Sequence, residues 1–346
     1  MKQLKWLNCA KFIAILTVMI DHTYMTLYDS KPILYASFVS VSLFILISGM
    51  TSYLSNSHHE ENWFQTFFRG SKKLIAAYCI ATLVHQLHFD HRFDLVSYLT
   101  HLIHFNISRT HYFVLLYLQL MLTSRFLYML LQKCPTGKRG MLYEALILIA
   151  VTLFSAWCSN YTNILGVYGG AGKLFAGTYL VSYFVGMLIM KHSLLEKAST
   201  GKCLVLTAAG GAVWFAIWRH MCQTGYDLAH YTPAELGLNP PGLLLTIQTV
   251  AVLVLLFGLF TLMDQLRILI PITNLFAFIG KHTLYIFLYH DMIYADYLVP
   301  YLYTDNVWIN RIIFLFGMIA IPLALEWLIT QIQKALHTVM YCPKKS

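Results

Sequence analysis

The chain has 346 residues, of which 58% are hydrophobic and only 11% are charged, and its formal net charge is +9 at pH 7. Soluble domains carry about 25% charged residues, so this composition excludes an ordinary water-soluble enzyme or binding module. The cations form no basic stripe interleaved with aromatic residues, so no nucleic-acid partner is expected. The seven cysteines lack paired metal-ligand spacing and predict neither a zinc site nor a disulfide framework.

Long apolar runs dominate the chain. A membrane-spanning helix needs about 20 mostly apolar residues, because its backbone amides must bond within the helix. The sequence predicts about ten such helices and therefore one all-α, polytopic membrane domain over residues 1–346. The first run is longer than a signal-peptide core and is expected to be retained. The predicted runs are 8–28, 32–54, 71–88, 112–131, 141–158, 174–190, 203–220, 243–263, 272–295 and 308–332.

The orientation follows from the Lys and Arg residues, which accumulate on the cytoplasmic side of membrane proteins. With the N-terminus inside, fifteen of them fall in cytoplasmic segments and six in outer segments. This bias predicts that both termini are cytoplasmic, that the 221–242 loop is outside, and that the protein is multipass in the cell membrane. Juxtamembrane cations also meet anionic lipid head groups, which explains the net positive charge.

Two ionisable residues on the first predicted helix share a face. Lys11 and His22 are eleven residues apart, which returns to within about 20° of the same face about 16 Å along the helix. Ionisable residues inside a membrane are costly and by default mark a ligand, a pathway or a catalytic site. In the alternative interpretation, the Lys11 side chain only extends to the membrane–water interface, and His22 is a neutral, hydrogen-bonded core residue.

Further cations are predicted near the cytoplasmic end of the helices. Together they would form a positive vestibule that suits a phosphorylated ligand, unless they only anchor the helices at the interface. The candidate residues are Lys11, Arg69, Lys72, Lys73, Arg125 and Lys281.

His290 lies on the ninth predicted helix at a depth similar to that of His22, so the two imidazoles are expected to share one chamber. Glu326 and Asp21 are the acidic residues expected at membrane depth, where one of them would orient a base or carry a proton. Spacing assigns this role to neither residue.

Two other motifs are weaker. The segment 169–173 resembles a phosphate loop, but Leu174 stands where Ser or Thr is required, and we reject it. A histidine-rich stretch has three-residue spacings that place imidazoles on one helical face. In an aromatic-rich outer segment histidine is more often an interfacial polar group, so we expect no metal site. Its histidines are His85, His88, His91, His101 and His104.

Three segments together resemble the acyltransferase-3 family of multipass membrane acyltransferases, over nearly the whole chain. AKFIAILTVMIDHTY is similar to the family's basic residue, ten residues and histidine, with Lys11 in place of the usual arginine. VSLFILISGMTSYL is similar to its phenylalanine-rich run that ends in Ser-Gly, here at Gly49. FAFIGKHTLYIFLYHDMI resembles a late helix that begins with a glycine, here Gly280, and closes on a histidine, here His290.

The resemblance implies an enzyme that transfers acyl groups other than aminoacyl groups. The expected donor is acyl-coenzyme A, usually acetyl-coenzyme A, and the expected acceptor is a hydroxyl of a cell-surface or lipid-linked glycan. His22 would be the general base, with an acyl-histidine intermediate as the less favoured variant. His290 would be a second polar group of the chamber, and its alternative is a packing histidine.

Two other functions are also compatible with the sequence. A succinyltransferase of the same family would use the same residues with a different donor. A proton-coupled or solute transporter would use the intramembrane Lys, His and Glu residues as a pathway, although no matching pair of broken helices supports it.

Overall fold

The structure is a computed structural model that describes residues 4–58, 62–108, 110–161, 175–195, 198–224 and 243–341. These residues form helices and connections, and no β-strand occurs among them. The α-helices of the first half are α1 (Lys5–His22), α2 (Lys31–Ser37), α3 (Ser40–Ser57), α4 (Trp63–Asp90), α5 (Leu95–His104), α6 (Tyr112–Gln132) and α7 (Lys138–Tyr161). Those of the second half are α8 (Leu180–Lys191), α9 (Thr200–Thr224), α10 (Leu243–Gln265), α11 (Ile270–Lys281), α12 (Thr283–Met292), α13 (Val299–Leu302) and α14 (Val307–Tyr341).

Each of the ten predicted runs overlaps at least one of these helices, but several boundaries were wrong. The second run is divided between α2 and α3, and the ninth between α11 and α12. The third run begins earlier than predicted, at Trp63, because Asn62 and Gln65 form a reciprocal capping box at the start of α4. The basic cluster at 69–73, which lies at the start of the predicted run 71–88, is therefore inside α4.

The break between α11 and α12 falls at His282. The backbone of His282 departs from helical values, with φ −107° and ψ 12°. Its ring nitrogen Nδ1 lies 2.7 Å from Oε2 of Glu326 on α14. Apolar periodicity does not report such a contact between distant helices, so the sequence predicted one continuous run.

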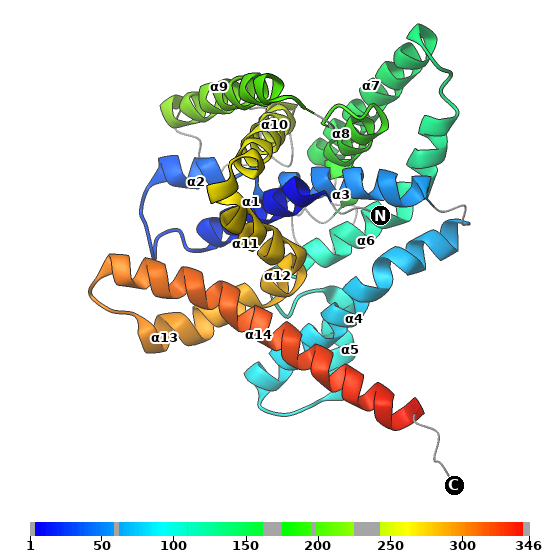
Figure 1. Cartoon of the computed structure of the whole chain (residues 1–346). Coiled ribbons are helices and arrows are strands. Elements are labelled where there is room, and N and C mark those ends of the chain that lie inside the picture. The colour runs from blue at the N-terminus through cyan, green and yellow to red at the C-terminus, as the bar shows by residue number, and fades with distance from the viewer. Residues whose placement is uncertain are drawn as a thin grey trace.

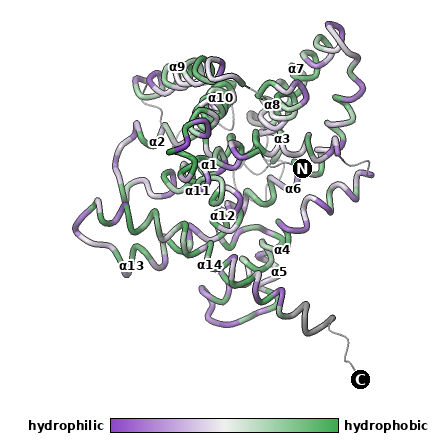
Figure 2. The backbone as a smooth tube through the Cα atoms, viewed as in Figure 1, coloured by the Kyte–Doolittle hydropathy of each residue, from purple (hydrophilic) through white to green (hydrophobic). Residues whose placement is uncertain are grey.

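Among the described residues, six helical segments are long and apolar enough to cross a membrane, the first of them formed by α2 and α3 together: Lys31–Ser57, Tyr112–Gln132, Lys138–Cys158, Thr200–Thr224, Leu243–Gln265 and Val307–Ala335. Hydrophobic residues run along the helices in Figure 2. On α7, Leu142, Leu146, Ile149 and Leu153 are all exposed and follow helical spacing. Soluble proteins rarely expose such continuous apolar surfaces, whereas lipid accommodates them. The total of ten spans stays a prediction.

Helix α1 lies near the middle of the bundle and packs along α11, while α14 runs across the front (Figure 1). A glycine makes the first contact close, because a Cβ built on Gly280 would lie 1.8 Å from the backbone oxygen of Asn8. Glycines also allow α3 and α8 to cross closely, because Gly49 lies against the backbone of Tyr183 and Gly186 lies against the backbone of Leu46. In lipid, such close packing of small residues is a main source of helix association.

Contacts between helix ends agree with the predicted alternation of the helices. Nζ of Lys5 at the start of α1 lies 2.6 Å from Oδ1 of Asp264 near the end of α10, and both are predicted to be cytoplasmic. Nε of Arg311 at the start of α14 donates to the backbone oxygen of Leu27, at 3.0 Å, and both are predicted to be outside. Which of the two ends faces the cytoplasm stays a prediction.

Candidate functional site

His22 is the last residue of α1, at the point where the chain turns out of the helix. The hydroxyl of Thr23 donates to the backbone oxygens of Met19 and Ile20, at 3.0 and 3.1 Å. The hydroxyl of Tyr28 donates to the oxygen of Ile20 at 2.6 Å. These bonds add to those from the backbone N–H of Thr23, which donates to the same two oxygens, at 3.1 and 3.2 Å, and they anchor the last turn of α1. They fix the position from which the His22 side chain, 21% exposed, reaches into the site.

His290 approaches the same point from α12 and is completely buried. Its ring nitrogen Nδ1 lies 3.0 Å from each of the backbone oxygens of Ile286 and Phe287. Carbonyl oxygens only accept hydrogen bonds, so Nδ1 carries the proton and Nε2 of a neutral His290 is an acceptor. The core that holds the two helices together includes Ile15 and Met19 of α1.

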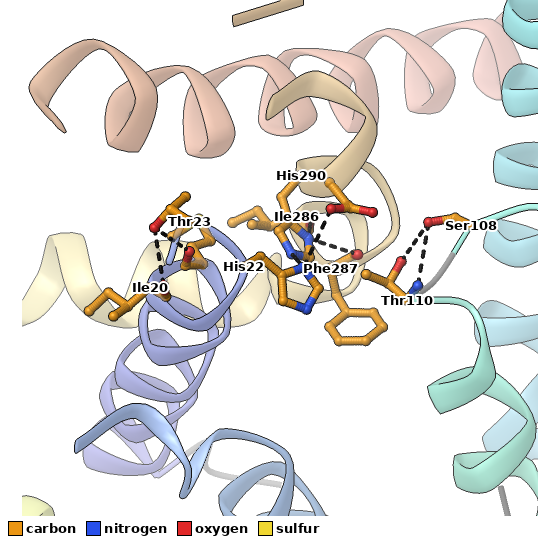
Figure 3. A network of polar contacts seen from close by, with 10 residues as sticks. Ile20, His22, Thr23, Ser108, Thr110, Ile286, Phe287 and His290 are labelled. Carbon is orange, nitrogen blue, oxygen red and sulfur yellow. Dashed lines mark hydrogen bonds and ion pairs between the residues drawn. The ribbon is translucent and has the colours of Figure 1, made fainter. Parts of the chain in front are cut away.

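The structure brings the two histidines together, as Figure 3 shows. Nδ1 of His22 lies 3.3 Å from Nε2 of His290, and their ring centroids are 5.0 Å apart. Because Nε2 of His290 accepts, Nδ1 of His22 must donate, and the lone pair of His22 is then on its Nε2. No described residue bonds this Nε2. The contact therefore orients His22 and leaves it with a free basic nitrogen.

A carboxylate adjoins the pair. Oδ1 of Asp291 lies 3.5 Å from Nδ1 of His22, and the residue is only 9% exposed. A negative charge at this distance stabilises an imidazolium more than a neutral imidazole. Asp291 is not among the site residues predicted from the sequence, where Asp21 and Glu326 were the candidate carboxylates. Asp291 directly follows His290, on the helix end that was predicted to lie near His22. This position in the sequence could have indicated that Asp291 belongs to the site.

A cavity of about 320 Å³ lies between α1, α3, α4, α6, α11 and α12. Its lining includes Lys11, Lys73 and Lys281 together with Phe113 and Phe287. The ring centroids of these two phenylalanines are 4.8 Å apart, and that of Phe287 is 6.0 Å from the ring centroid of His290. The cavity thus joins a group of cations to the surroundings of the histidine pair.

The three lysines differ in their partners. Nζ of Lys73 lies 3.6 Å from Oε1 of Glu326, whereas no hydrogen bond or ion pair with a described residue is found for Lys11 or Lys281. Two ammonium groups at the cavity therefore keep their donors for a ligand. A polyanionic ligand with phosphate groups matches these groups in charge and hydrogen bonding.

The other predicted cations do not line this cavity in the described part of the chain. Nη2 of Arg69 donates to the hydroxyl of Ser55 at 3.1 Å. Nη1 of Arg125 donates to the backbone oxygen of Asn56 at 3.5 Å, and Lys72 is exposed on α4. Neighbouring residues on one helix point in different directions, and this explains why Lys73 lines the cavity whereas Arg69 and Lys72 of the same helix do not.

Glu326 lies with the cavity cations and not with the histidine pair. It bonds His282 and Lys73 at the same time, at 2.7 and 3.6 Å. It therefore links α14 to α4 and to the junction between α11 and α12. The expectation that one of Glu326 and Asp21 orients the base gains no support from these contacts, because Asp291 is the carboxylate found next to His22.

The histidine-rich stretch makes separate contacts. His88 lies 3.2 Å from Asp296, and His101 lies 2.8 Å from the Asn106 side chain. His85 instead packs against His111, with ring centroids 4.9 Å apart. Among the described residues, no group of three or more His, Cys, Asp or Glu side chains could hold a metal ion.

Comparison with known proteins gives one match. The family model described as "Acyltransferase domain" of the acyltransferase-3 family matches residues 4–330. No curated protein and no solved structure is found to match the chain. The family match covers nearly the whole sequence, including the helices that carry Lys11, His22 and His290, and it confirms the resemblance of the sequence motifs. The chain therefore belongs to the acyltransferase-3 family of membrane acyltransferases.

Proposed function

We propose that this protein transfers an acyl group, most simply acetyl, from cytoplasmic acyl-coenzyme A to a hydroxyl of a cell-surface or lipid-linked glycan. The observation that carries the proposal is the cavity that connects unpaired lysines with the surroundings of the His22 and His290 pair. Family membership supports acyl transfer over the transporter alternative. The proposed donor and acceptor are those that the resemblance to the family implies.

The donor end of the site suits coenzyme A. This molecule carries several phosphate groups and is supplied in the cytoplasm, where the lysine-rich ends of the helices are predicted to lie. Lys11 and Lys281 would bind phosphate oxygens through charge-assisted hydrogen bonds. The arm would follow the apolar part of the cavity toward Phe287. Eleven residues of helix separate Lys11 from His22, about 16 Å, which is comparable in scale to an extended pantetheine arm.

At the histidine pair, Nε2 of His22 would remove the proton from the acceptor hydroxyl. The hydroxyl oxygen attacks the thioester carbonyl carbon, a new C–O bond forms, and the C–S bond breaks. The imidazolium of His22 then returns its proton to the leaving thiolate, so the base is regenerated without a net proton change. His290 holds the orientation of His22, and Asp291 stabilises the positive charge that exists between the two proton transfers.

Direct transfer requires donor and acceptor to meet at His22. The cavity approaches the histidines from the lysine side, so the acceptor would arrive from the opposite, outer end of α1. A glycan hydroxyl is a weak nucleophile at neutral pH and needs such a base, typically for a rate gain of 100- to 10,000-fold. An acyl-histidine intermediate is the less favoured variant, because the neighbouring Asp291 stabilises a protonated imidazole.

The test combines donor binding with transfer. Purified protein should bind acetyl-coenzyme A in calorimetry, and membranes containing the wild-type protein should add acetyl groups that mass spectrometry detects on surface glycans. His22→Ala should keep donor binding and lose at least 99% of transfer per folded molecule, judged by melting temperature and yield. Preferred use of succinyl-coenzyme A would move the assignment to a succinyltransferase. Absence of binding to every acyl-coenzyme A, together with normal transfer by His22→Ala, would contradict the proposal.

A further inference from the structure

A second cavity, of about 290 Å³, lies along the crossing of α1 and α11. Four of its six lining residues have charged or amide side chains. The lining consists of Lys5, Asn8, Asn274, Ala277, Phe278 and Lys281. Lys5 and Asn8 are three residues apart on α1 and therefore share a face of that helix. Lys281 lines the first cavity as well, so the two cavities adjoin at this residue.

The Asn8 side chain has unused hydrogen-bonding capacity. Asn8 is only 5% exposed, and no hydrogen bond of its amide to a described residue is found. Buried polar side chains are normally paired, because an unpaired one costs free energy. This amide lines the cavity and can bond a ligand there.

Lys281 gives the cavity a positive charge, whereas the charge of Lys5 is balanced by Asp264. Nζ of Lys5 is held by Asp264 and by the hydroxyl of Thr273, both at 2.6 Å. An ammonium group has three donors, so one donor of Lys5 is left for the cavity. Lys281 has no bond to a described residue and retains all of its donors. A fixed cation, a free cation and a free amide around one cavity make a suitable site for an oxyanion.

We propose that this second cavity binds a phosphate-bearing group, and that during acyl transfer this group is the nucleotide end of acyl-coenzyme A. The proposal rests on the proposed function and adds a second site for the same donor. The arm would lie in the first cavity, and Lys281 would contact phosphate oxygens where the two cavities adjoin. Phe278, 52% exposed, offers a ring for base stacking, and asparagine amides match the hydrogen-bonding edge of adenine.

A phospholipid head group offers the same phosphate chemistry at a membrane surface, so the experiment must separate the two sources. Asn274 is exposed on α11 and forms no bond with a described residue, so a charged side chain can be introduced there without disturbing the packing of the helices. Asn274→Asp should weaken binding of adenosine 3′,5′-bisphosphate, and Asn274→Lys should strengthen it, each by about fivefold or more. Binding is measured by calorimetry in detergent without added phospholipid. The bisphosphate lacks the pantetheine arm of coenzyme A.

Arg267→Gln is the matched control. Arg267 is exposed near the start of α11, lines neither cavity, and its substitution changes the charge by one, as Asn274→Asp does. It should leave affinity for the bisphosphate within about twofold, because exposed charges outside the site are screened. In parallel, both Asn274 variants are reconstituted in nanodiscs of phosphatidylcholine with or without phosphatidylglycerol. Retention of the anionic lipid should not differ between them.

The outcomes separate the two proposals. Absence of bisphosphate binding by the wild-type protein, or equal affinity in both Asn274 variants, overturns the nucleotide site. Altered retention of phosphatidylglycerol with unchanged bisphosphate affinity also overturns it and assigns the cavity to a lipid head group. In each of these cases continued acyl transfer by the wild-type protein would leave the proposed function intact. If the wild-type protein neither binds nor uses any acyl-coenzyme A, the result contradicts the proposed function itself, and with it the nucleotide site.

Discussion

Nδ1 of His22 lies 3.3 Å from Nε2 of His290, whose other ring nitrogen is bonded to backbone oxygens of its own helix. This chain of contacts sets the tautomer of both rings. A residue on α12 thereby determines which nitrogen of a residue on α1 is basic. In proteins that use histidine as a base, a second group commonly holds the imidazole in this way. In the proposed mechanism that second group is itself a histidine, His290.

Replacing His290 should therefore affect the chemical step and not donor binding. We expect His290→Ala to lower kcat by roughly 10- to 100-fold, with little change in the Kd for acyl-coenzyme A, because a misoriented His22 still adjoins the site. Steady-state kinetics and calorimetry on the same preparation would measure both quantities. If His290 only fills space, the variant would lose thermal stability, and its remaining folded fraction would have normal kcat.

Two buried carboxylates should behave differently when neutralised. Asp291→Asn should reduce kcat about tenfold, because the imidazolium of His22 loses a charge 3.5 Å away. Glu326→Gln is the companion variant, since Glu326 bonds His282 and Lys73 and does not touch the histidine pair. It should alter KM for the donor more than kcat. Equal effects of the two substitutions on kcat would argue against the separate roles.

The position of each cation on α1 and α4 predicts its importance for donor binding. Lys11→Gln should raise the Kd for acyl-coenzyme A about 10- to 100-fold, since a hydrogen bond to a charged group contributes about 1.5–3 kcal/mol. Lys72→Gln removes the same charge from an exposed position outside the cavity and should change the Kd less than threefold. Calorimetry at two salt concentrations would check both variants. An equal loss in both would indicate general attraction and not a defined site.

Close packing at Gly280 makes a prediction about stability. A Cβ at this position would lie 1.8 Å from the backbone oxygen of Asn8, so Gly280→Ala must push α11 away from α1. Overpacking of this kind typically costs about 1–3 kcal/mol, and we expect a lower melting temperature. Gly201→Ala is the control, because a Cβ there meets nothing within 4 Å. The prediction is wrong if the two variants melt at the same temperature.

The orientation in the membrane can be tested by labelling in intact cells. Arg92 and Lys138 are both exposed, at opposite predicted faces of the membrane. In a background without reactive native cysteines, Arg92→Cys should react with an impermeant thiol reagent, and Lys138→Cys should react only after the cells are opened. The reverse pattern would place the lysine-rich helix ends outside, where no acyl-coenzyme A is supplied.

The sequence by itself determined the all-helical membrane character of the chain and its family. Both depend on local properties, namely the length of apolar runs and short motifs within single helices. The spacing of Lys11 and His22 on one helix, and the similar depth of His290, likewise follow from a rise of 1.5 Å per residue. These properties belong to single helices and do not depend on how the helices pack.

Only the tertiary structure decided which of these residues come together. Arg69, Lys72 and Arg125 have the charge and the approximate depth of cavity residues, yet they do not line the cavity. Asp291 lies beside His22, and Glu326 bonds Lys73 and His282 instead. The reason is geometric: depth follows from position along a helix, whereas contact also requires the rotation of each helix about its axis and the choice of its neighbours. Close crossings such as that of Gly280 and Asn8 set both quantities.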